Sequence, residues 1–355
     1  MKAFALLVTV ACCASIPLAA QNAPPAMNFD SAANVLTLPD DVYLGEVGGV
    51  ATNSRGDLFV YTRTGHPTLS MATARPFAHG GSRLFQFDRS GKFTREIGQG
   101  LYGFLFAAQV RVDPQDNLWV VDEMSGMVIK FDPQGRVALL LGRKPESVNN
   151  PPRAGGAGGG AEGGGGGRGR APGAGADQDV FNRPTDVAWD AQGNIFVADG
   201  RGNARIAKFS KDGVFVKSWG QKGNAPGQFA DVDSIVVDAR GNVYAADAGN
   251  GRIQVFDNNG TYQREIGNVG NVQAICITPG SNQVMFASNS NPPNDLDKAG
   301  EIYKLRLDGT MVGKFGRAGK LLKEFGSVSA IDCRTEATLY VGEVGNFRVQ
   351  KLTLH

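Results

Sequence analysis

The segment PTDVAWDAQGNIFVADGRGNARIAKFSKDGVFVKSWG (residues 184–220) is followed by a near copy, DVDSIVVDARGNVYAADAGNGRIQVFDNNGTYQREIG (residues 231–267). Each copy contains four β-rich runs separated by short turns. Glycine residues in these turns, such as Gly193 and Gly241, supply the positive φ angles that tight hairpins require. Each copy is therefore predicted to form a four-stranded antiparallel sheet whose neighbouring strands are consecutive in the chain.

Weaker copies extend this pattern over the rest of the chain. They occupy residues 48–98, 107–142, 272–316 and 327–355. The last copy ends after three strands, and residues 31–38 form an isolated β-rich run near the N-terminus. Repeated four-stranded units form the blades of a β-propeller, and an N-terminal strand can complete the last blade. The sequence predicts an all-β fold, a six-bladed β-propeller over residues 31–355 whose ring is closed by the N-terminal strand.

The N-terminal segment differs from the repeats. Residues 1–20 contain Lys2, a short apolar run and small residues up to Ala20, which is the layout of a secretory signal peptide. The apolar run is too short to span a bilayer. Residues 21–30 are polar and contain proline, which predicts a tether. We therefore expect a secreted or periplasmic protein that does not span the membrane.

The composition limits the remaining possibilities. The formal net charge is +2, with 36 basic and 34 acidic residues mixed along the chain, so we expect no nucleic acid partner. Residues 153–176 contain 13 glycines and no aliphatic side chain larger than alanine. Such a segment buries too little surface to offset its chain entropy, which predicts a disordered loop inserted between the second and third units.

Two cysteines, Cys276 and Cys333, follow the predicted signal peptide. They fall on corresponding strands of neighbouring units, at positions offset by one residue. Because side chains alternate between the two faces of a strand, the offset predicts that the two side chains point to opposite faces. We expect two buried free thiols, although an oxidising compartment would allow a disulfide.

The repeats resemble a known family over about residues 45–355. Segments such as FVADGRGNARI and AGNGRIQVF resemble the NHL repeat. Residues 181–267, with PTDVA and PGQF, resemble most the lyase domain of the peptidylglycine amidating enzymes. The resemblance implies a six-bladed propeller. In that family, a zinc ion held by three histidines helps to split a peptidyl-α-hydroxyglycine into an amidated peptide and glyoxylate.

The residues that carry the family's chemistry are replaced. The positions that match the three zinc histidines hold Ala108, Asp233 and Ser329. One carboxylate does not make a recognisable zinc site. The sequence therefore predicts no zinc and no other cofactor, and it leaves calcium undecided. The histidines of the chain lie at other positions and are His66, His79 and His355.

Further family positions are also changed. Arg201 stands where the family has its catalytic tyrosine, and Ser327 stands where it has a methionine. Ala330 replaces an acidic residue that the family associates with a structural calcium. Arg63 and Arg252 match arginines of the family.

Arg252 is open to a second interpretation, because Arg205 and Arg348 occupy the same position in their repeats. An arginine that recurs in this way is typical of a structural contact. We expect these arginines to form ion pairs from blade to blade with the acidic residues Asp199, Asp247 or Glu343.

The innermost strands are expected to present a ring of residues to one mouth of the central channel. Most members of the ring are small and neutral, which predicts a roomy pocket with Asp233 as its single charge. The leading hypothesis is a secreted propeller that binds a small polar ligand, a peptide or a protein partner through Arg63, Asp233, Arg252 and Arg201, without the zinc lyase activity of its relatives. The ring consists of Gly48, Ala108, Thr185, Asp233, Gln273 and Ser329.

Two alternatives remain open. Arg63 could hold a substrate carboxylate while Asp233 acts as a general base or binds a cation, which would make the protein a divergent lyase or a hydrolase. The propeller could instead be a platform for protein assembly at the cell envelope, with the glycine-rich loop as a spacer. Propellers host unrelated functions, so the fold does not choose between these possibilities. The sequence favours binding over catalysis and does not identify the ligand or the oligomeric state.

Overall fold

The computed structural model describes residues 24–355, with gaps at residues 66–67, 72–74, 79–80, 143–179 and 293–294. The predicted signal peptide and the predicted glycine-rich loop lie outside the described residues, as do His66 and His79. Within the described part of the chain, no helix is long and apolar enough to cross a membrane.

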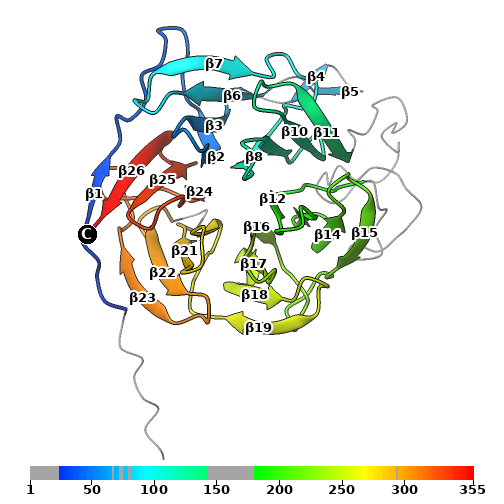
Figure 1. Ribbon diagram of the computed structural model, residues 1–355. Coiled ribbons are helices and arrows are strands. Elements are labelled where there is room, and N and C mark those ends of the chain that lie inside the picture. Colours follow the sequence, from blue (N-terminus) through cyan, green and yellow to red (C-terminus); the bar gives the residue numbers. More distant parts are fainter. Residues whose placement is uncertain (1–23, 66–67, 72–74, 79–80, 143–179, 293–294) are drawn as a thin grey trace, which may run out of the picture.

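Six four-stranded antiparallel sheets are arranged in a ring around a central axis (Figure 1). The structure therefore confirms the predicted all-β, six-bladed propeller. The strands of each blade are given from the axis outward. The first blade has β2 (Glu46–Thr52), β3 (Leu58–Arg63), β6 (Ser82–Phe87) and β7 (Phe93–Ile97), the second has β8 (Ala107–Val112), β9 (Leu118–Asp122), β10 (Met127–Phe131) and β11 (Val137–Gly142), and the third has β12 (Asp186–Trp189), β13 (Ile195–Asp199), β14 (Arg205–Phe209) and β15 (Phe215–Trp219). The fourth has β16 (Val232–Val237), β17 (Val243–Asp247), β18 (Arg252–Phe256) and β19 (Tyr262–Ile266), the fifth has β20 (Ile275–Ile277), β21 (Val284–Asn289), β22 (Glu301–Arg306) and β23 (Met311–Phe315), and the sixth has β24 (Val328–Asp332), β25 (Thr338–Glu343), β26 (Arg348–Leu354) and β1 (Phe29–Ala32).

Two short elements lie outside these sheets. The segment between β3 and β6, expected to be a loop, contains the hairpin of β4 (Thr68–Met71) and β5 (Arg75–Ala78). The 3-10 turn η1 (Ala248–Asn250) connects β17 to β18.

The hydrophobic core lies between the blades rather than at the axis. Six clusters of buried side chains each join one pair of adjacent blades. Between the third and fourth blades, for example, Trp219 of β15 packs against Phe256 of β18 with ring centroids 6.1 Å apart. Because both faces of a blade are covered by its neighbours, the second strands β9, β13 and β17 are buried along their whole length.

In four blades, a buried carboxylate at the end of the second strand accepts a hydrogen bond from the loop that enters the same blade; these are Asp122, Asp199, Asp247 and Glu343. Asp199 accepts hydrogen bonds from the backbone N–H of Asn182 and from Arg205. Asp247 does the same with Ala230 and Arg252. The bonds from Asn182 and Ala230 give backbone donors of the entering loops a partner.

The expected ion pairs of the repeated arginines are present, but they do not connect neighbouring blades as predicted. They lie within one blade: Arg205 bonds Asp199 at 2.8 Å, and Arg348 of β26 bonds Glu343 of β25 at 2.7 Å. The antiparallel register explains this, because it places Asp199 directly opposite Arg205 on adjacent strands. The blade-to-blade assignment was therefore wrong.

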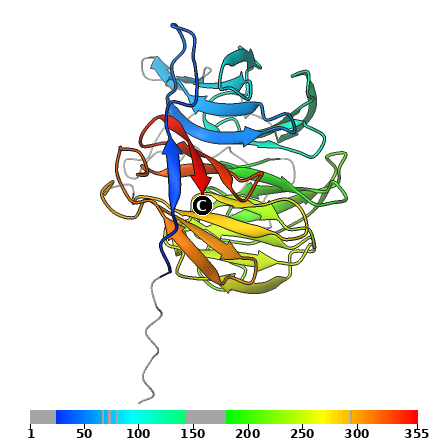
Figure 2. The same ribbon diagram turned by 60° about the vertical axis from the view of Figure 1, so that its left-hand side comes forward.

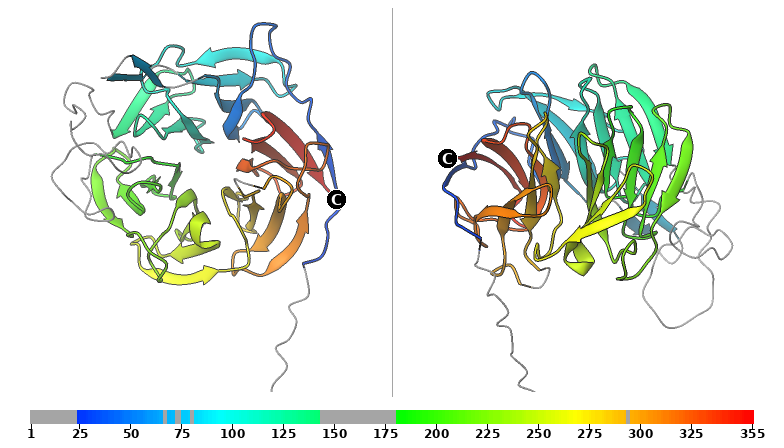
Figure 3. Two further views of the ribbon diagram at one scale, coloured as in Figure 1. Left: turned by 180° about the vertical axis from the view of Figure 1, so that it is seen from behind. Right: turned by 60° about the horizontal axis from the view of Figure 1, so that its bottom comes forward.

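The N-terminal segment runs along the outside of the ring. Strand β1 pairs with β26, with Phe29 opposite Leu354, so the strand in this position is earlier in the chain than the expected residues 31–38 (Figure 2). Ala26 bridges to Lys314 of β23, and Thr37 bridges to Lys92 of the first blade. The described part of the expected tether is thus attached to the outer edge of the propeller, as the view from behind also shows (Figure 3).

Cys276 of β20 and Cys333, which follows β24, form a disulfide bond with their Cα atoms 6.0 Å apart. The prediction of two free thiols is wrong. Neighbouring blades stack face to face, so a side chain on one face of a blade meets a side chain on the opposite face of the next blade. The offset by one residue therefore brings the two sulfur atoms together, inside the core cluster between the fifth and sixth blades.

Candidate functional site

Four inner strands contain a β-bulge near their N-terminal end. In β16, for example, the pairing with β17 shifts between Val232 and Ser234, which leaves Asp233 as the extra residue. A bulge turns a side chain away from the regular ladder, and bulges are frequent beside functional sites. The residues placed in this way are Gly48, Ala108, Asp233 and Ser329.

These bulges lie at one mouth of the central channel, where the structure has a cavity of about 350 Å³. We call this cavity the charged mouth. No side chain fits at Gly48, because an added Cβ would lie 2.4 Å from the carbonyl oxygen of Ala107. The other five residues of the expected ring all line the cavity: Ala108, Thr185, Asp233, Gln273 and Ser329. The positions that match the family's three histidines therefore meet in one place.

The prediction that Asp233 is the single charge of the pocket is wrong, because Glu46 and Glu123 also line the charged mouth, together with Arg63 and Arg201. The repeat contained a signal for both glutamates. Asp122 and Asp199 occupy equivalent positions in their repeats, but the next residue is Glu123 in one repeat and the uncharged Gly200 in the other. Glu46 lies two residues before Gly48, which belongs to the ring. Glu123 lies in a turn and Glu46 is the first residue of β2, so both positions are close to the entrance of the channel.

Asp233 is the most unusual group of the site. Its side chain is 9% exposed, and Oδ1 lies 3.1 Å from Nη2 of Arg201. The contact is ionic only, because Oδ1 is buried and receives no hydrogen bond with acceptable geometry from the described residues. Burial raises the pKa of Asp233 to about 6; the charge of Arg201 opposes this rise, and the charges of Asp231 and Glu123 add to it.

Arg201 is held by charge rather than by hydrogen bonds. Its guanidinium faces Asp233 on one side, and its Nε lies 3.7 Å from Oε2 of Glu123 on the other. Glu123 is itself fixed by Arg183, which bonds it at 2.7 Å. Burial lowers the pKa of Arg201, but Asp233 and Glu123 outweigh it, so the pKa is raised and the charge is kept. The guanidinium can therefore donate to a ligand without losing a hydrogen bond to any described residue.

Arg63 is more rigidly held. Its Nη1 bonds Glu46 at 2.7 Å, its Nε donates to the carbonyl oxygen of Ala107 at 2.9 Å, and its plane lies 3.7 Å from the ring centre of Phe106. Nη2 bonds no described residue, and the side chain is 17% exposed. Arg63 thus supplies a fixed positive charge at the wall of the charged mouth.

Arg252 is placed elsewhere. It is buried between Asp247 at 3.0 Å and Glu265 at 2.8 Å, and it donates to the carbonyl oxygens of Ala225 and Gln228. It does not line the charged mouth. Of the four residues predicted to bind a ligand, the structure therefore brings Arg63, Arg201 and Asp233 together.

The residues of the charged mouth do not fit a zinc ion. Among the described residues, no group of three or more histidine, cysteine, aspartate or glutamate side chains could hold a metal. Of the three positions that match zinc ligands, only Asp233 carries a charge, and the Ser329 hydroxyl donates to the carbonyl oxygen of Val47. The prediction that the protein has no cofactor remains untested.

Comparison with known proteins agrees with this architecture. The NHL repeat family model matches residues 181–209 and 229–256. Peptidylglycine alpha-amidating monooxygenase of Rattus norvegicus is 28% identical over 335 residues, which cover 88% of this chain and 31% of that protein. Peptidyl-alpha-hydroxyglycine alpha-amidating lyase 1 of Drosophila melanogaster is 26% identical over 344 residues, with coverage of 88% and 58%. The chain thus spans about a third of the first relative and just over half of the second.

A solved structure shows the same fold at lower sequence identity. The streptogramin B lyase structure has a TM-score of 0.52 and 13% identity, and the match covers 92% of this chain and 98% of that chain. The fold and the sequence matches thus lead to the same conclusion. The chain carries NHL repeats on a six-bladed β-propeller and is homologous to the peptidyl-α-hydroxyglycine amidating lyase domains.

Proposed function

We propose that the charged mouth binds a small polar ligand or the end of a peptide, without the zinc lyase chemistry of its relatives. The observation that carries this proposal is the buried Oδ1 of Asp233, which has no hydrogen-bond donor among the described residues. A buried polar atom of this kind costs about 1–3 kcal/mol until a partner satisfies it. A ligand that donates to Asp233 removes this penalty.

The neighbouring arginines define the other half of the ligand. Arg201 and Nη2 of Arg63 offer donors that no described residue uses, so they suit a carboxylate or carbonyl oxygen. Asp233 and Glu123 suit an ammonium or amide N–H. The charged mouth therefore favours a molecule with a donor and an acceptor close together, and its volume of about 350 Å³ is enough for a short peptide end.

A binding titration tests this proposal. The probe is L-alanyl-L-alanine, measured by calorimetry beside its N-acetyl derivative, which lacks the ammonium group, and its C-terminal amide, which lacks the carboxylate. We expect Asp233→Asn and Arg201→Met each to weaken binding of the dipeptide by about tenfold or more, as expected for a hydrogen bond to a charged group.

Arg136→Met is the matched control, because Arg136 is exposed and its side chain pairs, among the described residues, only with Asp132. Its affinity for the dipeptide should equal that of the wild type. Equal affinities of all three variants, or of the dipeptide and both derivatives, would contradict binding at the charged mouth.

One observation favours a second candidate, a divergent lyase or hydrolase. Burial raises the pKa of Asp233 to about 6, a value that suits a general base near neutral pH. Glyoxylate release from a peptidyl-α-hydroxyglycine distinguishes the two candidates. We expect none above the rate of a protein-free control. Release that is abolished in Asp233→Asn would establish the second candidate instead.

Export of the protein is also a proposal. The disulfide between Cys276 and Cys333 supports it, since such bonds persist in oxidising compartments. Mass spectrometry of the protein from the extracellular or periplasmic fraction should find an N-terminus near Gln21. An intact N-terminus on cytoplasmic protein would contradict export.

A further inference from the structure

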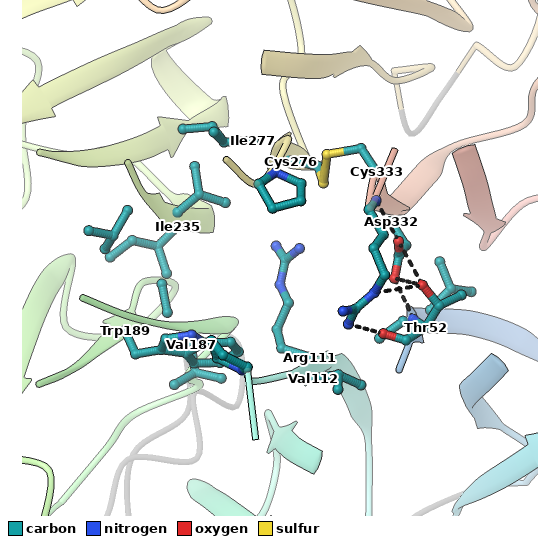
Figure 4. A pocket seen from close by; sticks show the side chains of 18 of the residues that line it. Thr52, Arg111, Val112, Val187, Trp189, Ile235, Cys276, Ile277, Asp332 and Cys333 are labelled. Carbon is teal, nitrogen blue, oxygen red and sulfur yellow. Dashed lines mark hydrogen bonds between the residues drawn. A yellow bond between two sulfur atoms is a disulfide. The ribbon is translucent and has the colours of Figure 1, made fainter. Parts of the chain in front are cut away.

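A second cavity lies at the opposite mouth of the channel, where the inner strands end. Its volume is about 340 Å³ (Figure 4). All six blades contribute to it, with Thr52, Arg111, Trp189, Ile235, Ile277 and Asp332 as one residue from each. We call this cavity the apolar mouth.

The walls of the apolar mouth are mostly hydrocarbon. Ile235, Ile277 and the disulfide of Cys276 and Cys333 form one side. Trp189 lies across from them and is supported from behind by Trp119, with ring centroids 6.0 Å apart. A surface of this kind favours the apolar body of a ligand.

Two arginines line the cavity. Arg334 bonds Thr52 at the wall, whereas Figure 4 shows Arg111 projecting into the middle. Its Nε and Nη2 bond the two carboxylate oxygens of Asp186 at 3.0 and 2.6 Å. Nη2 also reaches Ser234 at 3.1 Å and the carbonyl oxygen of Ile275 at 3.3 Å. These bonds hold the guanidinium across the channel. Nη1 bonds no residue that the structure describes, so its N–H donors remain available.

The acidic groups near Arg111 are already occupied. Asp186 also accepts hydrogen bonds from the backbone N–H groups of Val187 and Ile235, so Arg111 is not its only source of stabilisation. Asp332 accepts from the backbone N–H groups of Thr52 and Arg334. The carboxylate oxygens are thus directed into the wall, whereas Arg111 directs a donor into the cavity.

We propose that the apolar mouth is a second binding site, which takes a small carboxylate with an apolar body. The carboxylate accepts a hydrogen bond from Nη1 of Arg111, and the body packs against Trp189 and Ile277. A charge-assisted hydrogen bond at the base of an apolar cavity gives both orientation and affinity. This site is distinct from the charged mouth, because the two cavities share no lining residue.

Three probes with the same apolar body test the proposal: 3-phenylpropionate, 3-phenylpropionamide and 3-phenylpropylamine, each titrated by calorimetry against the full chain. The carboxylate should bind at least about tenfold more tightly than the amide, because only the carboxylate makes a hydrogen bond between two charged groups. The amine should not bind. Equal affinities of the three probes, or no binding of the carboxylate, would overturn the proposal.

Two variants locate the binding. Arg111→Met removes the donor and should abolish binding of 3-phenylpropionate. Because Arg111 is part of a buried ion pair, this variant must first be shown to fold. Ile277→Trp fills the cavity without touching the ion pair, and it should abolish binding as well. Arg136→Met is the control and should bind as the wild type does. Retained binding in Ile277→Trp would overturn the proposal even if Arg111→Met fails to fold.

Discussion

The two mouths of the channel are built from the same six inner strands, but they present different chemistry. At the charged mouth, bulges and loops place Asp233 and Arg201, whose charges are incompletely paired, beside Glu123. At the apolar mouth, regular strand ends place hydrocarbon around Arg111, whose charge is firmly paired with Asp186. The comparison indicates that the blade repeat fixes the scaffold at both ends, while the irregular backbone at the charged mouth allows unsatisfied polar groups.

The largest expected effect concerns the paired arginine. Arg111→Met should lower the free energy of unfolding by about 3–5 kcal/mol, because it leaves Asp186 buried without its charge partner. Urea denaturation measures this change. The double variant Arg111→Met with Asp186→Leu should recover part of the stability. A single variant as stable as the wild type would show that Arg111 is not a structural ion pair.

The disulfide at the apolar mouth should have the next largest effect. Replacing both Cys276 and Cys333 by serine opens a loop with a sequence separation of 57 residues. We expect a loss of about 2–4 kcal/mol in the free energy of unfolding. The same loss should follow reduction of the wild type by dithiothreitol, whereas the double variant should not respond to the reductant. A wild type whose stability is unchanged by reduction would contradict this prediction.

The pH dependence of stability reports on Asp233 of the charged mouth. Because the folded pKa of Asp233 is about 6 and the unfolded value is near 3.8, the folded state binds this proton more tightly. The stabilisation is complete below about pH 4 and is lost as the pH rises through about 6. Between about pH 5 and about pH 7.5, the wild type should therefore lose about 1.4 kcal/mol relative to Asp233→Asn.

Denaturation of both proteins at several pH values checks this difference. Burial also raises the pKa of Asp122 to about 6, but Asp122 is present in both proteins and its contribution cancels. Parallel pH profiles for the wild type and the variant would show that Asp233 does not titrate in this range.

The smallest effect is expected for the arginine of the charged mouth. The side chain of Arg201 is 38% exposed and its polar contacts with the described residues are ionic, so Arg201→Met should change the free energy of unfolding by about 0–1 kcal/mol. The same urea measurement gives this value. A loss as large as that of Arg111→Met would erase the distinction between the two arginines.

The sequence predicted the fold well because the blade repeat is local: each turn and strand is specified by neighbouring residues. It also predicted five of the residues that line the charged mouth, because equivalent repeat positions converge on the axis. It failed where contacts join different blades. The disulfide, for example, depends on how two sheets stack, and the alternation of side chains along one strand does not report this.

The charged groups show a second limit of the sequence. Glu123 lies in a loop whose direction is not set by the repeat, and the match of Arg252 to the family did not reveal that its partners Asp247 and Glu265 hold it away from the cavity. The sequence does not predict a role for Arg111. Its contacts are with Asp186 and Ser234 of other blades, and only the closed ring brings these residues to it across the channel.

The most direct test of the proposed function is the titration of the Asp233 carboxyl group, followed by carbon NMR with and without L-alanyl-L-alanine. In the free protein, the midpoint should lie near the value of about 6 that burial produces. With excess dipeptide, the midpoint should fall, because the bound ammonium group stabilises the ionised carboxylate. An unchanged midpoint in excess dipeptide would contradict the claim that Asp233 is the centre of a ligand site.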